Sequence, residues 1–214
     1  GGNGFYWKIA LSPEDPELIE IRRGESGIRA WAAEPGEYYH SFDGSYGGLW
    51  RRNGRPPQLL AGVGFSAQGK FEGSYYRRTA ESRAPDLAWM FEGIEDQEIL
   101  GDFGFSGGGA AGFELDRADV RLGTPEEVRV VASSENHTSS FVLVPEEMLT
   151  HITNWPGEEE QQKLIRSDIV YFRTPSGGEV FSTGSITFCG SLPWNDFDNN
   201  ISRLLENVIR RFLQ

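Results

Sequence analysis

The chain has 214 residues, a hydrophobic fraction of 38% and a formal net charge of −12. This length and composition allow a buried core and exclude the disordered and fibrous classes, and no apolar run approaches the roughly 18 residues of a membrane span. The acidic balance disfavours nucleic acid and anionic membranes as partners, because neither would find a basic stripe for its phosphates, and it predicts a cytoplasmic protein.

The chain opens on residues 1–7 (GGNGFYW), where glycines and an asparagine precede three aromatic residues. Gly and Asn allow a sharp turn where larger side chains would clash. The run has two interpretations: a turn that presents the Tyr6 hydroxyl as an oxygen ligand or proton donor, or a hairpin turn entering an aromatic core strand. Because the run starts inside a motif, we expect a strand to precede Gly1 in a longer protein.

The N-terminal half predicts little regular structure beyond two strands. These are expected at residues 5–11 and 18–23, separated by Pro13 and Pro16, which cannot donate to a strand ladder. The sequence that follows is rich in Gly, Tyr, Arg and Pro. It predicts an irregular insertion over about residues 28–125, and long structured loops of this kind usually shape a pocket.

Residues 126–214 have clearer strand and helix patterns, and we expect one α/β domain over the whole chain. Apolar, β-branched runs are typical of buried strands. The predicted elements are strands at 128–134, 168–174 and 179–186 and helices at 145–152 and 157–166.

The last helix has the clearest pattern. Asn199 or Asn200 is its N-cap, and we expect the helix to lie on a sheet. Its apolar residues follow the helical period: Ile201, Leu204, Leu205, Val208, Ile209 and Phe212.

Several motifs favour structural over catalytic interpretations. Residues 107–112 (GGGAAG) fit a dinucleotide fingerprint by letter, but residues 113–117 have no helical period, so we reject that interpretation. No GxSxG elbow is present. Cys189 excludes an intrachain disulfide framework, and its apolar surroundings predict a buried, inert thiol. His40 follows two tyrosines and is able to line a pocket, although a structural role is the simpler one for all three histidines.

Oxygen donors form the remaining pattern. Tyr6 and Tyr46 follow glycine turns, Tyr75 and Tyr76 follow a Gly-Lys pair, and Glu92 ends the apolar residues 87–92. Phenolate and carboxylate are hard donors, which suit a highly charged ion such as ferric iron. A carboxylate that closes an apolar run is either the polar end of an element or a ligand in a dry pocket.

Five runs in order resemble the N,N-dimethylformamidase large-subunit family in its C-terminal region, and the resemblance covers nearly the whole chain. It implies a glutamine-amidotransferase-like, Rossmann-like sheet flanked by helices. The runs are residues 1–7, 48–69 (GLWRRNGRPPQLLAGVGFSAQG), 89–93 (WMFEG), 107–117 with 122–125 (LGTP), and 177–186 (GGEVFSTGSI).

The resemblance also implies a mononuclear ferric iron bound by two tyrosines and one glutamate. Tyr6 and Glu92 match two of these ligands, the second tyrosine would precede Gly1, and Glu114 is an alternative carboxylate. Further polar residues surround the metal in the family, and His40 and Glu179 are the candidates here. The family pattern also implies a small partner subunit and an oligomer.

The implied reaction is hydrolysis of a small formamide to amine and formate. A metal of this kind polarises the amide carbonyl or lowers the pKa of a bound water, and a carboxylate or imidazole takes the proton. Phe5, Trp7, Trp89 and Phe91 are candidates for an apolar substrate pocket, although core aromatics would have the same pattern. The alternatives are a non-catalytic amidotransferase-like binding or assembly module, and sugar binding by the aromatic loops.

Overall fold

The computed structural model describes residues 7–23, 44, 51, 54–144 and 157–214. The chain divides into two compact units, residues 1–57 and 58–214, and each is described by itself. All strand pairs among the described residues are antiparallel. No helix in this part of the chain is long and apolar enough to cross a membrane.

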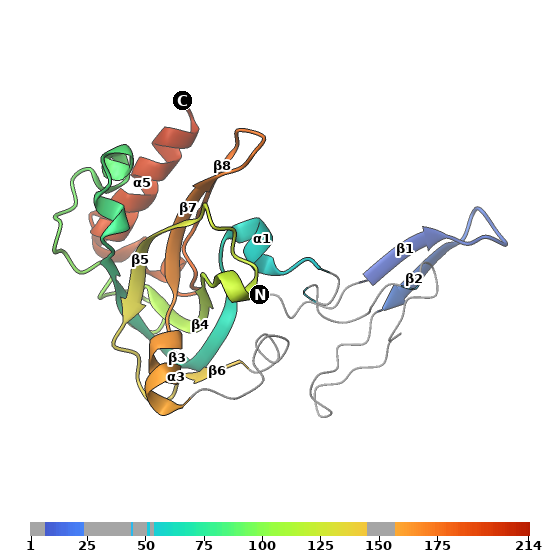
Figure 1. Cartoon of the computed structure of the whole chain (residues 1–214), viewed down its shortest axis with the longest axis horizontal. Helices are drawn as coiled ribbons and strands as arrows, with labels where there is room; N and C mark the ends of the chain where they lie inside the picture. The colour runs from blue at the N-terminus through green and yellow to red at the C-terminus, as the bar shows by residue number, and fades with distance from the viewer. Residues whose placement is uncertain (1–6, 24–43, 45–50, 52–53, 145–156) are drawn as a thin grey trace. The chain divides into compact units, whose positions relative to one another are not determined.

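The first unit contains a two-stranded ribbon, drawn in blue in Figure 1. Strand β1 (Trp7–Leu11) pairs with β2 (Ile19–Arg23), and the Ser12 amide donates to the Leu18 carbonyl oxygen (2.8 Å) where the strands end. Both strands were predicted from the sequence, and both are confirmed.

The second unit is built on a curled six-stranded sheet, in the order β4-β3-β5-β7-β8, with β6 paired to β3 (Figure 1). Strand β3 is 15 residues long and lies beside β6 in its first half and β5 in its second half. Register shifts between β3 and β4 bend the strands, which curls the sheet. The strands are β3 (Gly64–Arg78), β4 (Ala111–Arg117), β5 (Arg129–Glu135), β6 (Val142–Leu143), β7 (Asp168–Arg173) and β8 (Glu179–Ser182).

Helix α5 (Asn200–Phe212) packs on one side of this sheet, as the sequence predicts. Asn199 is the N-cap, since its side-chain oxygen accepts a hydrogen bond from the Ser202 amide (2.9 Å). The buried side of α5 joins the main core, which also contains Met90 and Ile169. The other helical segments are α1 (Pro57–Ala61), η2 (Glu81–Arg83), η3 (Pro85–Phe91), η4 (Val120–Leu122), α3 (Glu158–Leu164), α4 (Phe188–Ser191) and η5 (Trp194–Phe197).

The mixed α/β class is therefore confirmed, but two details of the expected sheet differ. A Rossmann-like sheet is largely parallel, whereas this one is antiparallel. Residues 64–117, expected to be part of an irregular insertion, supply β3 and β4. Glycine inside these strands has a packing role: a Cβ atom on Gly112 would lie 2.2 Å from the Glu72 carbonyl oxygen, and one on Gly73 would lie 2.4 Å from that of Gly109.

Three smaller predictions concern the glycine motif, Cys189 and the helix at 145–152. The glycine motif at residues 107–112 leads into β4 and not into a helix, which confirms that it is not a dinucleotide fingerprint. Cys189 is exposed, so the prediction of a buried thiol was wrong. The residue lies in α4, where Phe188 is buried and Cys189 faces outward. The helix expected at 145–152 lies outside the described residues.

Candidate functional site

The structure describes two of the four predicted site residues. Tyr6 and His40 lie outside the described residues, as does Tyr46. Glu92 and Glu179 are described, and they come from segments far apart in the sequence.

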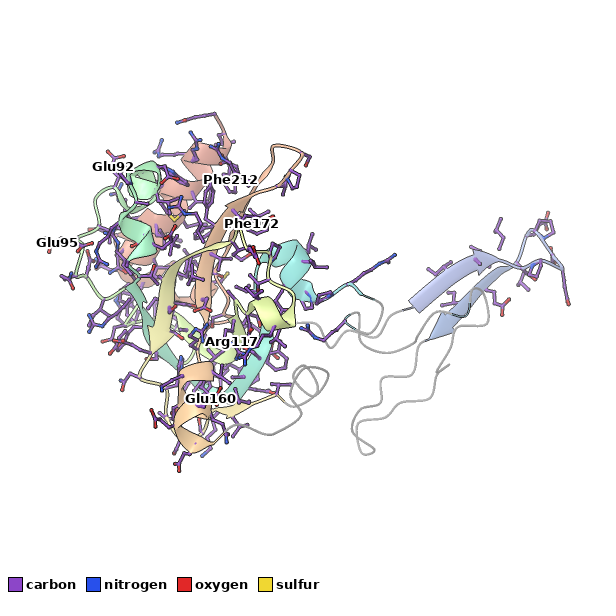
Figure 2. The ribbon with its side chains drawn as sticks, viewed as in Figure 1. Glu92, Glu95, Arg117, Glu160, Phe172 and Phe212 are labelled. Atoms are coloured by element: carbon purple, nitrogen blue, oxygen red, sulfur yellow. The ribbon has the colours of Figure 1, made fainter. Side chains whose placement is uncertain are left out.

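Glu92 is the C-cap of η3. Its backbone carbonyl oxygen accepts a hydrogen bond from the Asn207 side chain (2.9 Å), which ties the end of η3 to α5. The Glu92 side chain is exposed, and within the described residues no hydrogen bond or ion pair engages its carboxylate. Figure 2 shows Glu92 and Glu95 pointing outward from this side of the unit. The carboxylate is therefore available, but the described residues do not enclose it in a dry pocket.

Glu179 begins β8 and is mostly buried. Its Oε1 atom accepts hydrogen bonds from Nε of Arg173, its cross-strand partner on β7 (3.0 Å), and from Nη2 of Arg211 on α5 (3.5 Å). A carboxylate between two guanidinium groups is well suited to hold arginines in place.

Arg211 connects the two glutamates. A cavity of about 540 Å³ is lined by Glu179, Arg211 and Phe212, among others, and a second cavity of about 230 Å³ is lined by Trp89, Glu92 and Arg211, among others. The Arg211 guanidinium also lies 5.7 Å from the centre of the Trp89 ring. We call Trp89, Glu92, Glu179 and Arg211 the Arg211 groove.

The Arg211 groove has the composition of a binding surface. It combines an aromatic ring, an arginine and two carboxylates, one paired and one available. Among the described residues, no group of three or more His, Cys, Asp or Glu is able to hold a metal. Glu114, the alternative ligand, lies on β4 opposite Gln68 of β3.

The described tyrosines have structural environments. Tyr76 is fully buried, and its hydroxyl donates to the Thr183 carbonyl oxygen (2.7 Å) and lies 2.9 Å from the Ser167 hydroxyl. Burial raises the pKa of Tyr76, so it stays protonated and is unsuited to be a phenolate ligand. Tyr75 lies under the guanidinium of Arg77, 5.6 Å from its ring centre.

The expected aromatic pocket is divided between core and surface. Phe91 is buried, with the Arg78 guanidinium 4.1 Å from its ring centre. Trp89 packs edge-on against Tyr171, with ring centres 5.6 Å apart, and borders the Arg211 groove. Phe5 and the Trp7 side chain lie outside the described part.

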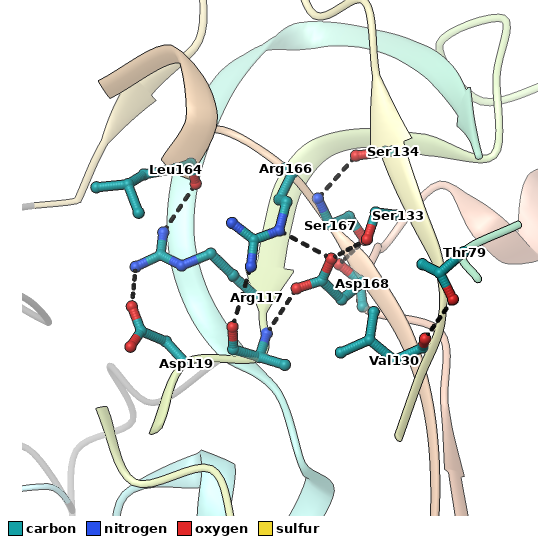
Figure 3. Close-up of polar contacts among 12 residues, drawn as sticks. Thr79, Arg117, Asp119, Val130, Ser133, Ser134, Leu164, Arg166, Ser167 and Asp168 are labelled. Atoms are coloured by element: carbon teal, nitrogen blue, oxygen red, sulfur yellow. Dashed lines mark hydrogen bonds and ion pairs between the residues drawn. The ribbon is translucent and has the colours of Figure 1, made fainter. Parts of the chain in front are cut away.

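The sequence reasoning missed a buried polar network, shown in Figure 3. Arg117 is fully buried and donates to the Leu164 carbonyl oxygen (2.8 Å) and to Asp119 (2.9 Å). A buried charge needs such partners, because the free-energy cost of removing it from water would otherwise destabilise the fold. The sequence contained one indication of the buried arginine. Side chains alternate along a strand, so Arg117 lies on the same face of β4 as the buried Leu115.

A second part of this region contains a serine and a histidine. The Ser167 amide donates to the Ser134 hydroxyl oxygen (2.7 Å), and that hydroxyl forms a hydrogen bond with His137 Nε2 (2.6 Å). Burial lowers the pKa of His137 from 6.5 to about 4, so the ring is neutral at pH 7. The hydrogen bond between Ser134 and Ser167 ties β5 to the start of β7. Ser134 is only 5% exposed, so its hydroxyl is not presented as a nucleophile.

Known proteins are similar to this chain over nearly its whole length. A family model described as N,N-dimethylformamidase beta subunit-like, C-terminal, matches residues 1–200. Two proteins named N,N-dimethylformamidase beta subunit, from an Alcaligenes species and from Paracoccus aminophilus, are each 41% identical to the chain over 212 residues. The match covers 99% of the chain and 27% of the length of each relative.

Proposed function

Since the chain belongs to the family described as N,N-dimethylformamidase beta subunit-like, C-terminal, we propose that it is part of a metal-dependent amidohydrolase that converts a small formamide to amine and formate. The observation that carries this proposal is the 41% identity to two named beta subunits over 99% of the chain. The chain spans about a quarter of those relatives, so the activity belongs to the full-length protein. The relatives are named as subunits, and we extend the proposal to a partner subunit and an oligomer.

Ferric iron remains part of the proposal, with Tyr6 and Glu92 as two ligands and a second tyrosine outside this chain. Phenolates and a carboxylate are a hard donor set, which fits such an ion. The described residues supply only Glu92 to this set, so they do not complete the site by themselves, and no reaction step is derived through the metal. His40 and Glu179 remain candidates for proton transfer, and the two arginine partners of Glu179 both contact its Oε1 atom.

The glutamine-amidotransferase-like core is likewise a proposal for the full-length protein. The resemblance supports it, whereas the antiparallel pairing of the strands described here does not. A structure of the full-length protein with a parallel sheet outside this chain would agree with that proposal.

Replacement of Glu92 by glutamine is expected to lower formamide hydrolysis at least about tenfold, since substitutions even outside the ligand shell of a metal site commonly cost that much. Glu95→Gln is the matched control, because Glu95 is an exposed glutamate three residues away on the same side (Figure 2). The measurement is formate release together with iron content for the full-length protein and both variants. Equal activity in the two variants would contradict the assignment of Glu92.

One observation favours a second function, a non-catalytic binding or assembly module. The Arg211 groove has an exposed Glu92 and an arginine-paired Glu179, an arrangement that suits contact with another molecule. In that case Glu92→Gln would leave hydrolysis unchanged and weaken association with a partner subunit instead.

A further inference from the structure

Two arginines beside the Arg211 groove are each paired closely with a carboxylate. Nε of Arg173 donates to Oε1 of Glu179 (3.0 Å), and Nη2 of the same arginine lies 2.9 Å from that oxygen. Nε and Nη2 of Arg210 both donate to Oε1 of Glu206 (3.0 and 2.6 Å). Each of these carboxylates is therefore held by two nitrogens of one guanidinium, which is the strong form of this ion pair.

Arg211 has weaker contacts than these two arginines. Among the described residues its guanidinium makes one hydrogen bond, from Nη2 to Oε1 of Glu179 at 3.5 Å, and it shares that oxygen with Arg173. Its Nε atom is buried and has no hydrogen-bond partner in the same part of the chain. A buried donor on a charged group is costly when it has no acceptor, so a structural ion pair accounts poorly for Arg211.

The Arg211 side chain contacts an aromatic ring and borders a cavity. The guanidinium lies 5.7 Å from the centre of the Trp89 ring, a contact that favours one position of the arginine. The cavity of about 540 Å³ is also bordered by Phe212 and by the turn residues Gly177 and Gly178, which have no side chains. The Arg211 side chain is 35% exposed although Nε is buried, so the Nη groups are the donors that a ligand can reach.

The charges favour an anion in this cavity over the one of about 230 Å³. Glu92 borders the smaller cavity, and within the described residues nothing engages its carboxylate, so it repels an anion there. Glu179 borders the larger cavity, but its charge is already balanced by Arg173. An anion in the larger cavity therefore meets the Arg211 guanidinium with little opposing charge.

The shape and charge of the donor group select the kind of anion. A guanidinium is planar and takes a carboxylate through two parallel N–H donors. A phosphate group carries a charge of about −1.5 to −2 at pH 7, which one arginine beside two glutamates balances poorly. A carboxylate has one negative charge and matches the fork of donors.

We propose that a small organic carboxylate binds in the cavity of about 540 Å³, with its oxygens on the Nη groups of Arg211 and its hydrocarbon part on Phe212. Phe212 is 45% exposed, and contact with the ligand removes part of its ring from water. The proposal names a binding site and no step of amide hydrolysis, so it does not depend on the proposed function or on a metal.

Calorimetric titration of the full-length protein with benzoate tests the ligand class. Benzoate is expected to bind more tightly than acetate, because its ring adds apolar contact. It is also expected to bind more tightly than benzamide, which has the same ring without the charge, and more tightly than inorganic phosphate. Benzamide or phosphate that bound as tightly as benzoate would overturn the proposal, and so would a failure of benzoate to bind.

Replacement of Arg211 tests the anchor of the site. Arg211→Gln removes the charge and is expected to weaken benzoate binding at least about tenfold, because a hydrogen-bonded charge is lost. Arg203→Gln is the matched control: Arg203 is an exposed arginine of the same helix, pairs with Glu206 and is not among the described residues that line either cavity. Thermal unfolding checks that both variants are folded. Equal affinity of the two folded variants for benzoate would overturn the proposal.

Glu179→Gln tests the competition for Arg211. Glutamine keeps the size of the side chain and removes the negative charge that engages the guanidinium, so benzoate is expected to bind this variant more tightly than the wild type. An affinity lower than that of the wild type would contradict an anion site beside Glu179.

Glu92→Gln separates this site from the proposed iron. A carboxylate held by Arg211 is expected to bind this variant at least as tightly as the wild type, because the substitution removes a nearby negative charge. Benzoate binding that is lost in Glu92→Gln and kept in Arg211→Gln would place the carboxylate on a metal. That result would overturn this proposal and leave the proposed hydrolysis standing.

Discussion

Replacing Asp168 by alanine is expected to lower the free energy of unfolding of the 58–214 unit by about 3–5 kcal/mol. Asp168 is fully buried, and its carboxylate accepts hydrogen bonds from the Ser133 hydroxyl (2.6 Å), Arg166 Nε (3.0 Å) and the Ala118 amide (2.9 Å). These groups come from β5, from the residues just before β7 and from the end of β4, as Figure 3 shows. Alanine would leave all three donors without their acceptor, and one of them is charged.

Hydrogen exchange of the β7 amides in the full-length protein measures this effect, because it reports the opening free energy of this unit separately from the rest. Asp102→Ala is the control: Asp102 is an exposed carboxylate, and its removal is expected to change stability by less than about 0.5 kcal/mol. If Asp168→Ala changed exchange no more than Asp102→Ala, the network of Figure 3 would not hold the strands together.

Stability is also expected to depend on pH through His137. Burial lowers its pKa in the folded protein from 6.5 to about 4, and the nearby Glu72 partly opposes this. Between these two values the unfolded chain binds a proton that the folded protein does not, so stability falls as pH decreases from about 6.5 to about 4. Above pH 6.5 His137 is unprotonated in both the folded and the unfolded protein, so it no longer makes the stability depend on pH. At about 1.4 kcal/mol per pKa unit, the loss is at most about 3–4 kcal/mol.

The His137→Gln variant isolates this contribution, since glutamine keeps a polar group near Ser134 without titrating. Its unfolding free energy is expected to vary less than that of the wild type between pH 6.5 and 4, although other groups titrate equally in both. An NMR titration of the histidine ring signals gives the pKa directly. A value near 6.5 for His137 would mean that the ring is hydrated and the pH argument fails.

The elements found from the sequence are those that local patterns specify. Helix α5 was predicted with its cap because the apolar period and Asn199 lie within one segment. Strands β5, β7 and β8 were found because β-branched runs mark them, although β8 ends earlier than expected. Strands β3 and β4 were missed because their glycines look like loop residues. Gly73 and Gly112 are needed because the backbones of β3 and the segment leading into β4 come very close at these positions. These backbones are far apart in the sequence, so the local pattern does not reveal the contact.

The candidate site was less accessible to sequence reasoning. The pattern of oxygen donors and the resemblance both pointed to Glu92, and the resemblance alone pointed to Glu179. Their positions beside Arg211, in the two cavities that it lines, required the fold. Arg211 itself gave no distinct signal, since a basic residue in the last turn of a helix is explained by the helix dipole. Asp168 and Ser134 lie within or next to predicted strands, but only the pairing of β5 with β7 shows that they join the same network.

Turnover of N,N-dimethylformamide by the full-length protein tests the proposed hydrolysis most directly. Formate and dimethylamine are expected to be released in equal amounts. A folded protein that contains iron and releases neither product would contradict the proposal that this chain is part of a formamide hydrolase.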